Sequence, residues 1–246
     1  MRYLIISDIH SNWEALEAVL ADAAGDYDTI VCCGDIVGYG ADPNAATDWV
    51  RKNVAAVVRG NHDKAATGSA AIEWFNAAAT AATLWTRDSL DADNLAYLTE
   101  LPEGPVLVNG FQVVHGSPLD EDEYIVTPGH AAQLYGYLGA AVTFFGHTHL
   151  QGGFLVHRNG TRIVERMSPT EREKTEVLSD DFASLINPGS VGQPRDGDPR
   201  AAYAIYVPEE KSVRYRRVSY DIDTAQRKII DAGLPALLAH RLALGS

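Results

Sequence analysis

The chain has few cysteines and few basic residues, and both shortages exclude classes of protein. Its 246 residues include two cysteines, Cys32 and Cys33, which are adjacent in an apolar run. Neighbouring strand residues point to opposite faces, so we expect two buried thiols rather than a disulfide or a redox pair. Twenty basic against 33 acidic residues give a net charge of −13, so we expect no long nucleic acid as a partner.

Long apolar segments are also missing. No stretch approaches the roughly 20 apolar residues of a membrane span, and Met1 and Arg2 lead directly into a strand without a signal-peptide pattern. We therefore expect no membrane contact and a cytoplasmic location. The hydrophobic fraction of 46%, without repeats or linkers, allows one sizeable core, and we predict a single domain over residues 1–246.

Short apolar runs are present, and polar residues follow them. The runs 3–6, 29–33, 54–58, 111–114 and 142–145 are short and predict strands. In an open parallel sheet, ligands bind outside the carboxyl ends of the strands, so we expect the groups that follow these runs to converge. These groups are Asp8-Ile9-His10, Gly34-Asp35, Gly60-Asn61-His62-Asp63, His115-Gly116 and Gly146-His147-Thr148-His149.

Helix signals separate the strands. Ser11 and Glu14 form a capping box that predicts a helix over residues 11–23, and Pro43 predicts the first turn of a helix over 43–52. A strand followed by a helix is half of a βαβ unit, so these signals favour an α/β fold.

The segment 64–101 is rich in alanine and is also predicted to be helical, with apolar residues at helical spacing from Ile72 to Ala82. It carries no obvious metal-binding residue. We expect Trp74, Phe75 and Trp85 to pack this helical layer on the sheet; an aromatic wall for a substrate is the alternative.

The last hundred residues carry turn signals and alternating strands. Asn159-Gly160 predicts a hairpin, and residues 203–207 and 213–218 predict a final strand pair. The stretch 167–181 is charged and poor in apolar residues, so we expect an exposed loop. Helices are predicted over 224–244, with a break at Gly233 to Pro235.

The polar groups at the strand ends form a set that suits metal binding. Carboxylate and amide oxygens mixed with imidazoles favour Mn, Fe or Zn over Ca or Mg. The set is too large for one tetrahedral ion, whereas two ions roughly 3.5–4 Å apart, bridged by a carboxylate, would use it fully. The set comprises Asp8, His10, Asp35, Asn61, His62, His115, His147 and His149.

These five motifs, in this order, resemble those of the calcineurin-like metallophosphoesterases, and they span residues 8 to 149. The later run 187–197 resembles the compact bacterial and archaeal phosphodiesterase branch, some members of which are described as diadenosine-tetraphosphatase-like. The resemblance implies a four-layer α/β/β/α sandwich with two mixed sheets and flanking helices. The segment 64–101 is longer than in the smallest members and is a candidate cap, so the substrate does not carry over.

The resemblance also implies a division of the ligands. Asp8, His10 and His149 would hold one metal; Asn61, His115 and His147 would hold the other; Asp35 would bridge them. His62 would face the leaving group rather than bind metal.

Asp63 and two arginines are further candidates around this set. Asp63, the second catalytic candidate, would pair with His62 and raise its pKa, or would instead cap the following helix. Arg195 and Arg200 would clamp a phosphate oxygen, or would be solvated in a turn-rich loop.

We therefore predict a binuclear metal-dependent phosphoesterase that uses metal-activated hydroxide, with manganese as the expected ion. A phosphodiesterase acting on a small phosphate ester or nucleotide is the leading expectation. A nucleotide pyrophosphatase and a phosphoprotein phosphatase stay open as alternatives. A non-catalytic scaffold is disfavoured because every ligand and the histidine are intact. The sequence predicts no oligomeric state.

Overall fold

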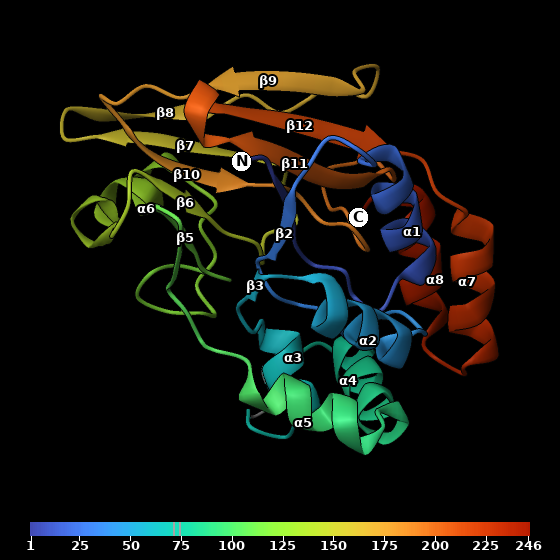
Figure 1. Cartoon of the computed structure of the whole chain (residues 1–246). Coiled ribbons are helices and arrows are strands. Elements are labelled where there is room, and N and C mark those ends of the chain that lie inside the picture. The colour runs from blue at the N-terminus through green and yellow to red at the C-terminus, as the bar shows by residue number, and fades with distance from the viewer. Residues whose placement is uncertain (71, 74) are drawn as a thin grey trace.

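Two mixed β-sheets face each other at the centre of the computed structural model, which describes residues 1–70, 72–73 and 75–246 (Figure 1). In the first sheet, the three strands nearest one edge are parallel and the others are antiparallel. Its strand order is β3 (Ala56–Val57), β2 (Thr29–Cys32), β1 (Tyr3–Ile6), β11 (Ala201–Val207), β12 (Ser212–Val218) and β9 (Glu173–Val177).

The second sheet has a similar plan, with three central parallel strands flanked by antiparallel ones. Its strand order is β4 (Val106–Val108), β5 (Phe111–Val113), β6 (Val142–Phe144), β10 (Ala183–Asn187), β7 (Gly152–His157) and β8 (Gly160–Val164). The parallel strands of both sheets end at the same side of the molecule, where the predicted site residues follow them.

Helices cover the outer faces of both sheets (Figure 1). The helices α1 (Trp13–Asp22), α7 (Ile222–Asp231) and α8 (Ala236–Leu244) lie together beside the first sheet, and α6 (Pro128–Gln133) lies on the second, before the short 3₁₀ turn Tyr135–Tyr137. A second 3₁₀ turn, Pro208–Glu210, joins β11 to β12. The remaining helices gather at one end of the molecule: α2 (Pro43–Asn53), α3 (Asn61–Ala66), α4 (Ala77–Ser89) and α5 (Ala92–Glu100).

The side chains of β1 show how the layers are built. Leu4 and Ile6 point to the helices and join the core that holds Leu16 of α1, whereas Tyr3 and Ile5 point between the sheets. This alternation follows from the two-residue period of a strand. Helices, sheet, sheet and helix therefore form four layers, and the predicted α/β/β/α sandwich is confirmed.

The two cysteines follow the same alternation. Cys32 belongs to the core under the helices and Cys33 to the core between the sheets, and both are free thiols. The prediction of two buried thiols on opposite faces is therefore confirmed.

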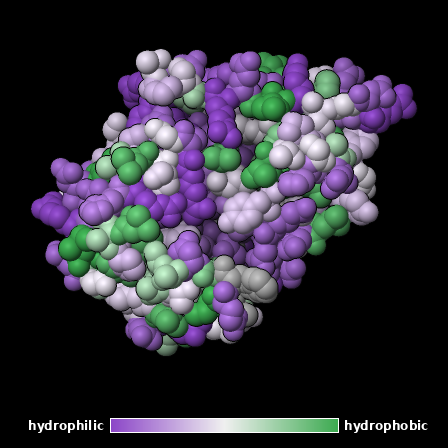
Figure 2. All heavy atoms as spheres, turned by 180° about the vertical axis from the view of Figure 1, so that it is seen from behind, coloured by the Kyte–Doolittle hydropathy of each residue, from purple (hydrophilic) through white to green (hydrophobic). Residues whose placement is uncertain are grey.

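The surface is predominantly polar. Figure 2 shows hydrophobic groups on one face as small separate patches among hydrophilic ones. None of the helices in the described part of the chain combines the length and apolar character needed to cross a membrane.

The predicted exposed loop over 167–181 is wrong in its centre. Glu173–Val177 forms β9, an edge strand that pairs with β12. It carries charged residues because an edge strand exposes one side to water, and charges there oppose pairing with other molecules. Charged edge strands lack the apolar alternation by which strands are recognised in a sequence.

Two helix starts also differ from the predictions. Ser11 has a left-handed backbone (φ 53°) and cannot begin α1; the cap is Asn12, whose side chain accepts from the N–H of Ala15. The apolar spacing that starts at Ile72 does not mark the beginning of a helix, because Asn76 caps α4 and the helix begins at Ala77. The hairpin at Asn159-Gly160, the final strand pair and the broken C-terminal helix pair are confirmed.

A buried ion pair fixes the loop between β10 and β11, which borders the site. Arg217 of β12 donates to Asp196 of this loop, and their side chains are 3% and 5% exposed. Arg217 also donates to Gln151 (Nε to Oε1, 2.9 Å), whose amide donates in turn to three backbone carbonyls.

We predict that Asp196→Ala lowers the free energy of unfolding by about 3 kcal/mol, because it leaves the Arg217 charge buried without its partner. The measurement is urea unfolding with chelator present, since a bound metal would add its own stabilisation. Asp180→Ala is the matched control. It breaks an exposed pair with Lys211 and should change stability little. Equal effects of the two substitutions would contradict the prediction.

Candidate metal centre

The predicted site residues meet where the strands of both sheets end. Asp8 and His10 follow β1, Asp35 follows β2, His115 follows β5, and His147 and His149 follow β6. Asn61 and His62 begin α3 directly after β3. The structure therefore brings together groups that are up to 141 positions apart in the sequence, from Asp8 to His149.

The backbone at this junction is strained. Five residues of the set have left-handed φ angles between 49° and 64°: Asp8, His10, Asp35, His147 and His149. Such a conformation costs of order 1–3 kcal/mol for each non-glycine residue and persists only where surrounding structure enforces it. Because five left-handed residues lie at one junction, we infer that the surrounding structure enforces this backbone and so positions these side chains.

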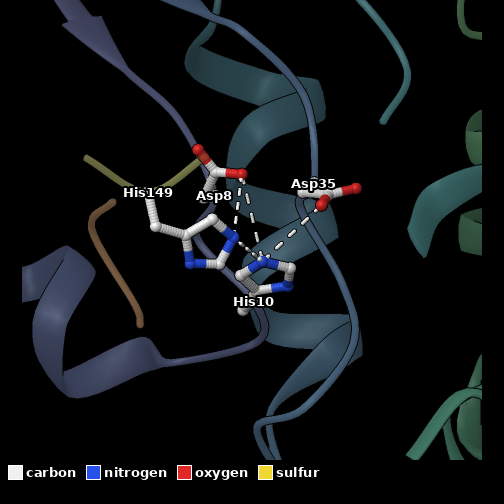
Figure 3. A group of neighbouring side chains, drawn as sticks. All are labelled: Asp8, His10, Asp35 and His149. Carbon is white, nitrogen blue, oxygen red and sulfur yellow. Dashed lines mark hydrogen bonds and ion pairs between the residues drawn. The ribbon is translucent and has the colours of Figure 1, made fainter. Parts of the chain in front are cut away.

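The first cluster consists of Asp8, His10, Asp35 and His149, which point toward one another (Figure 3). All four are nearly or fully buried. The Nε2 atom of His149 lies 3.3 Å from Oδ1 of Asp8, and Nε2 of His10 lies 3.6 Å from Oδ2 of Asp35. Metal–ligand bonds of about 2.0–2.2 Å place the ligands of one ion roughly 3–3.5 Å apart, so this spacing fits a small divalent ion.

The two histidines of this cluster are oriented by the backbone. Nδ1 of His10 lies 3.0 Å from the carbonyl of Val37, and Nδ1 of His149 lies 2.5 Å from the carbonyl of Gln193. Each Nδ1 must donate its proton to the carbonyl, which leaves a lone pair on Nε2. The two Nε2 atoms are 3.1 Å apart, so two lone pairs face each other, and a cation between them removes the conflict.

The second cluster contains Asp35, His115 and His147, with the amide of Asn61 beside them. Nδ1 of His115 donates to the carbonyl of Cys33 at 2.7 Å, and Nε2 of His147 donates to the carbonyl of Asp122 at 3.1 Å. Nδ1 of His147 keeps its lone pair, and Nε2 of His115 offers one when its proton leaves. Oδ1 of Asn61 lies 3.2 Å from Nε2 of His115 and adds an oxygen ligand.

Asp35 belongs to both clusters. Its Oδ2 atom lies 3.6 Å from Nε2 of His10 and 3.4 Å from Nε2 of His115. The same atom is buried and has no hydrogen-bond partner among the described residues, while Oδ1 accepts from the N–H of His62. One carboxylate oxygen is thus shared between the two groups.

Two glycines are needed at the site for space. A Cβ at Gly60 would lie 2.0 Å from Oδ1 of Asp35, and a Cβ at Gly146 would lie 2.1 Å from Oγ of Ser7. Neither has a positive φ, so close approach rather than backbone freedom explains both glycines.

The predicted pairing of Asp63 with His62 is wrong. Asp63 accepts from the backbone N–H groups of Gly60, Ile36 and Val37 and is fully buried. Asp63 therefore caps α3 and connects the loop after β2 to this helix. Capping was the alternative that the sequence left open. Because its side chain is fully buried, Asp63 cannot contact a substrate. Burial lowers the pKa of His62 to about 4, although the nearby Asp35 carboxylate opposes this shift, and Asp63 does not raise it.

The two arginines lie in different places. Nη2 of Arg195 is 3.0 Å from Oε1 of Gln193 and 3.3 Å from the hydroxyl of Tyr39, at the edge of the first cluster. Arg200 is bound through both ends of its guanidinium to Asp198, so its predicted role as a phosphate clamp is wrong.

The aromatic residues of segment 64–101 also lie in different places. The ring of Phe75 stacks on His62, with centroids 4.9 Å apart. Trp85 packs in the core shared by α4, α7 and α8, so it packs against helices and not on the sheet as predicted. Trp74 lies outside the described residues. Tyr39 and Tyr124, which stack on His62 and His147, were missed by the sequence reasoning because neither occupies a motif position.

Burial and neighbouring charges shift the pKa values of the residues in both clusters. Burial raises the pKa of Asp8 to about 7. Burial alone would lower the pKa of His115, but the adjacent Asp35 carboxylate raises it to about 10. Burial opposes ionisation of Asp35, yet His115 and His62 hold its pKa well below the usual range. The buried rings of His10 and His149 stay neutral, as metal ligands must.

Comparison with known proteins agrees with this geometry. The calcineurin-like phosphoesterase superfamily domain matches residues 1–211, and the chain belongs to that superfamily. With the buried cluster of Asp and His residues, this makes it a metal-dependent phosphoester hydrolase, as the sequence predicted.

Three relatives match nearly the whole chain, two of them solved structures. A metallophosphoesterase from Sphaerobacter thermophilus is 40% identical, with a TM-score of 0.86 over 100% of this chain and 99% of its own. The uncharacterized protein MJ0912 of Methanocaldococcus jannaschii is 37% identical over 98% of this chain and 97% of its own. The hypothetical protein PH1004 of Pyrococcus horikoshii, 18% identical, has the same fold, with a TM-score of 0.78 over 100% of this chain and 98% of its own.

We predict that metal uptake releases protons and weakens as the pH falls. At pH 7.5 the metal displaces the His115 proton, and below about pH 7 it also competes with protonation of Asp8. Calorimetric titration of the metal-free protein with Mn²⁺, in buffers of different ionisation enthalpy, counts the protons. His115→Ala should reduce the count, whereas His130→Ala, an exposed position, should not. A heat independent of the buffer would refute this.

Proposed function

We propose that the chain is a phosphodiesterase that holds two divalent ions, with Mn²⁺ as the expected ion. The observation that carries this is the shared Oδ2 atom of Asp35, buried between His10 and His115. A single oxygen at this distance from both histidine sets suits a bridging ligand. Asp8, His10 and His149 would complete the first site, and Asn61, His115 and His147 the second.

Bound ions would polarise the phosphoryl oxygens and lower the pKa of water. The protein residues supply position and charge. Carbonyl groups of Val37, Gln193, Cys33 and Asp122 fix the rings of the four histidines, which is the usual support of a metal-binding imidazole. Two divalent ions with two carboxylates leave two positive charges, a local attraction for a phosphate monoanion in an acidic chain.

Arg195 and His62 would contact the substrate. Nε of Arg195 is buried and finds no partner in the part of the chain that the structure describes, so it is available to a phosphate oxygen. His62 lies in neither metal cluster, and its buried Nδ1 makes no hydrogen bond to the described residues. Its ring lies between Tyr39 and Phe75, edge-on to His10 at 4.9 Å.

We predict that Asp35→Asn reduces the metal content from two ions toward one and lowers diester hydrolysis by at least about 10²-fold, because the bridging charge is lost. Elemental analysis and hydrolysis of bis-p-nitrophenyl phosphate under Mn²⁺ measure the two effects. Asp180→Asn, which removes only an exposed ion pair outside the cluster, is the control and should leave metal content and hydrolysis unchanged. A substrate panel of monoesters, diesters and nucleoside polyphosphates tests the ester class. Unchanged metal content in Asp35→Asn, or preferred hydrolysis of monoesters, would overturn the proposal.

We predict that His62→Ala keeps the metals but turns over poorly, by roughly 10²- to 10⁴-fold if the ring donates a proton to the leaving oxygen. The loss should then be larger for an alkyl ester than for a p-nitrophenyl ester, because p-nitrophenolate leaves without a proton. Equal losses for both esters would make His62 a positioning residue. Loss of metal would make it a ligand.

A further inference from the structure

A cavity of about 270 Å³ opens beside the second cluster. The residues that line it include Asn61, Lys64, Ala65, Phe75, Tyr124 and His147. A group attached to a phosphate at the metal centre would enter this cavity, because two of the proposed ligands line it.

The walls present flat aromatic surfaces. Tyr124 stacks on His147 with centroids 3.8 Å apart and an interplanar angle of 35°, yet the residue is 47% exposed. Phe75 stacks on His62 at 4.9 Å and is half-buried. Each ring thus has one face packed on a histidine of the site and contributes to the cavity. Flat, apolar walls of this kind favour a planar ring system, since stacking is worth roughly 1–3 kcal/mol per base.

The charge at the cavity disfavours a second phosphate. Lys64 is the one cation among its described lining residues, and Nζ is already bound to Glu121 (2.8 Å) and Asp122 (2.7 Å). Glu121 also binds Arg59 at 2.8 Å. A phosphate chain entering here would meet carboxylates and an engaged lysine, and it would have to break these ion pairs.

We propose that this cavity selects esters of a single phosphate with an uncharged planar substituent, of which a nucleoside is the natural example. The volume lies just below the usual range of about 300–1,000 Å³ for small-molecule pockets, so the cavity has room for one ring system. The inference rests on the proposed function, because the metal centre must hold the phosphate.

Binding to the Mn²⁺-loaded protein tests this without turnover. Adenosine 5′-monophosphate and ribose 5-phosphate differ only in the base, so calorimetry with both isolates its contribution. We expect the nucleotide to bind about tenfold more tightly. Adenosine 5′-diphosphate should bind no more tightly than the monophosphate. Equal affinity of the first two ligands, or a tighter diphosphate, would overturn the inference.

Two variants test whether the cavity rings cause the preference for the nucleotide. Tyr124→Leu and Phe75→Leu keep an apolar side chain but remove the flat ring, and each should erase most of the preference while ribose 5-phosphate binds as before. Tyr135→Leu, an exposed tyrosine outside the cavity, should leave the preference intact. Metal content measured on each variant shows that the centre is retained. If Tyr124→Leu weakens both ligands equally, the ring supports His147 instead and the inference fails. If neither ligand binds the loaded wild type, the proposed function fails with it.

Discussion

The structure depends on how the carboxylates and imidazole lone pairs buried at the strand ends are compensated. Asp8 and Asp35 are buried beside imidazoles whose lone pairs converge, and His10 and His149 hold their Nε2 atoms 3.1 Å apart. Buried charges and facing lone pairs are costly unless a cation compensates them. In the metal-free chain the proton on His115 supplies part of this compensation, and a divalent ion supplies it more completely. Ion binding is therefore coupled to the stability of this junction.

The rest of the fold keeps these carboxylates and imidazoles close together. Strands of both sheets deliver the ligands to one side, and backbone carbonyls such as those of Val37 and Gln193 leave each ring only one orientation. The carbonyl of Gln193 lies in the loop that Arg217 and Asp196 fix to the sheet. The left-handed residues are tolerated because these contacts, together with the close approach of Gly60 to Asp35, permit no relaxed alternative. Contacts outside the two clusters thus determine the positions of the ligand side chains.

The sequence predicted what is encoded locally. Short apolar runs followed by Asp, Asn or His located the strand ends, and the Asn159-Gly160 turn located a hairpin. Contacts between distant segments were not predictable: Asp63 bonds to Ile36 and Val37, 27 and 26 positions away, and no local signal distinguishes this from a bond to His62. The strand β9 was missed because an edge strand is stabilised by β12 and not by its own apolar pattern. Tyr124 was missed because only the fold places it on His147.

The segment 64–101 contributes part of the cavity lining, apart from the strand ends that carry most of the proposed ligands. The helix α3 begins at the proposed ligand Asn61 and continues into the cavity wall through Lys64 and Ala65. The helix α4 packs against α7 and α8 in a core that includes Tyr39, while the strand-end ligands are anchored by the sheets. Apart from Phe75 and Tyr124, which stack on His62 and His147, substitutions in the cavity lining would therefore reshape the cavity without moving Asp8 or Asp35. Under the proposed function, substrate selection and metal binding would thus depend on different parts of the fold, which meet at Asn61 and His147.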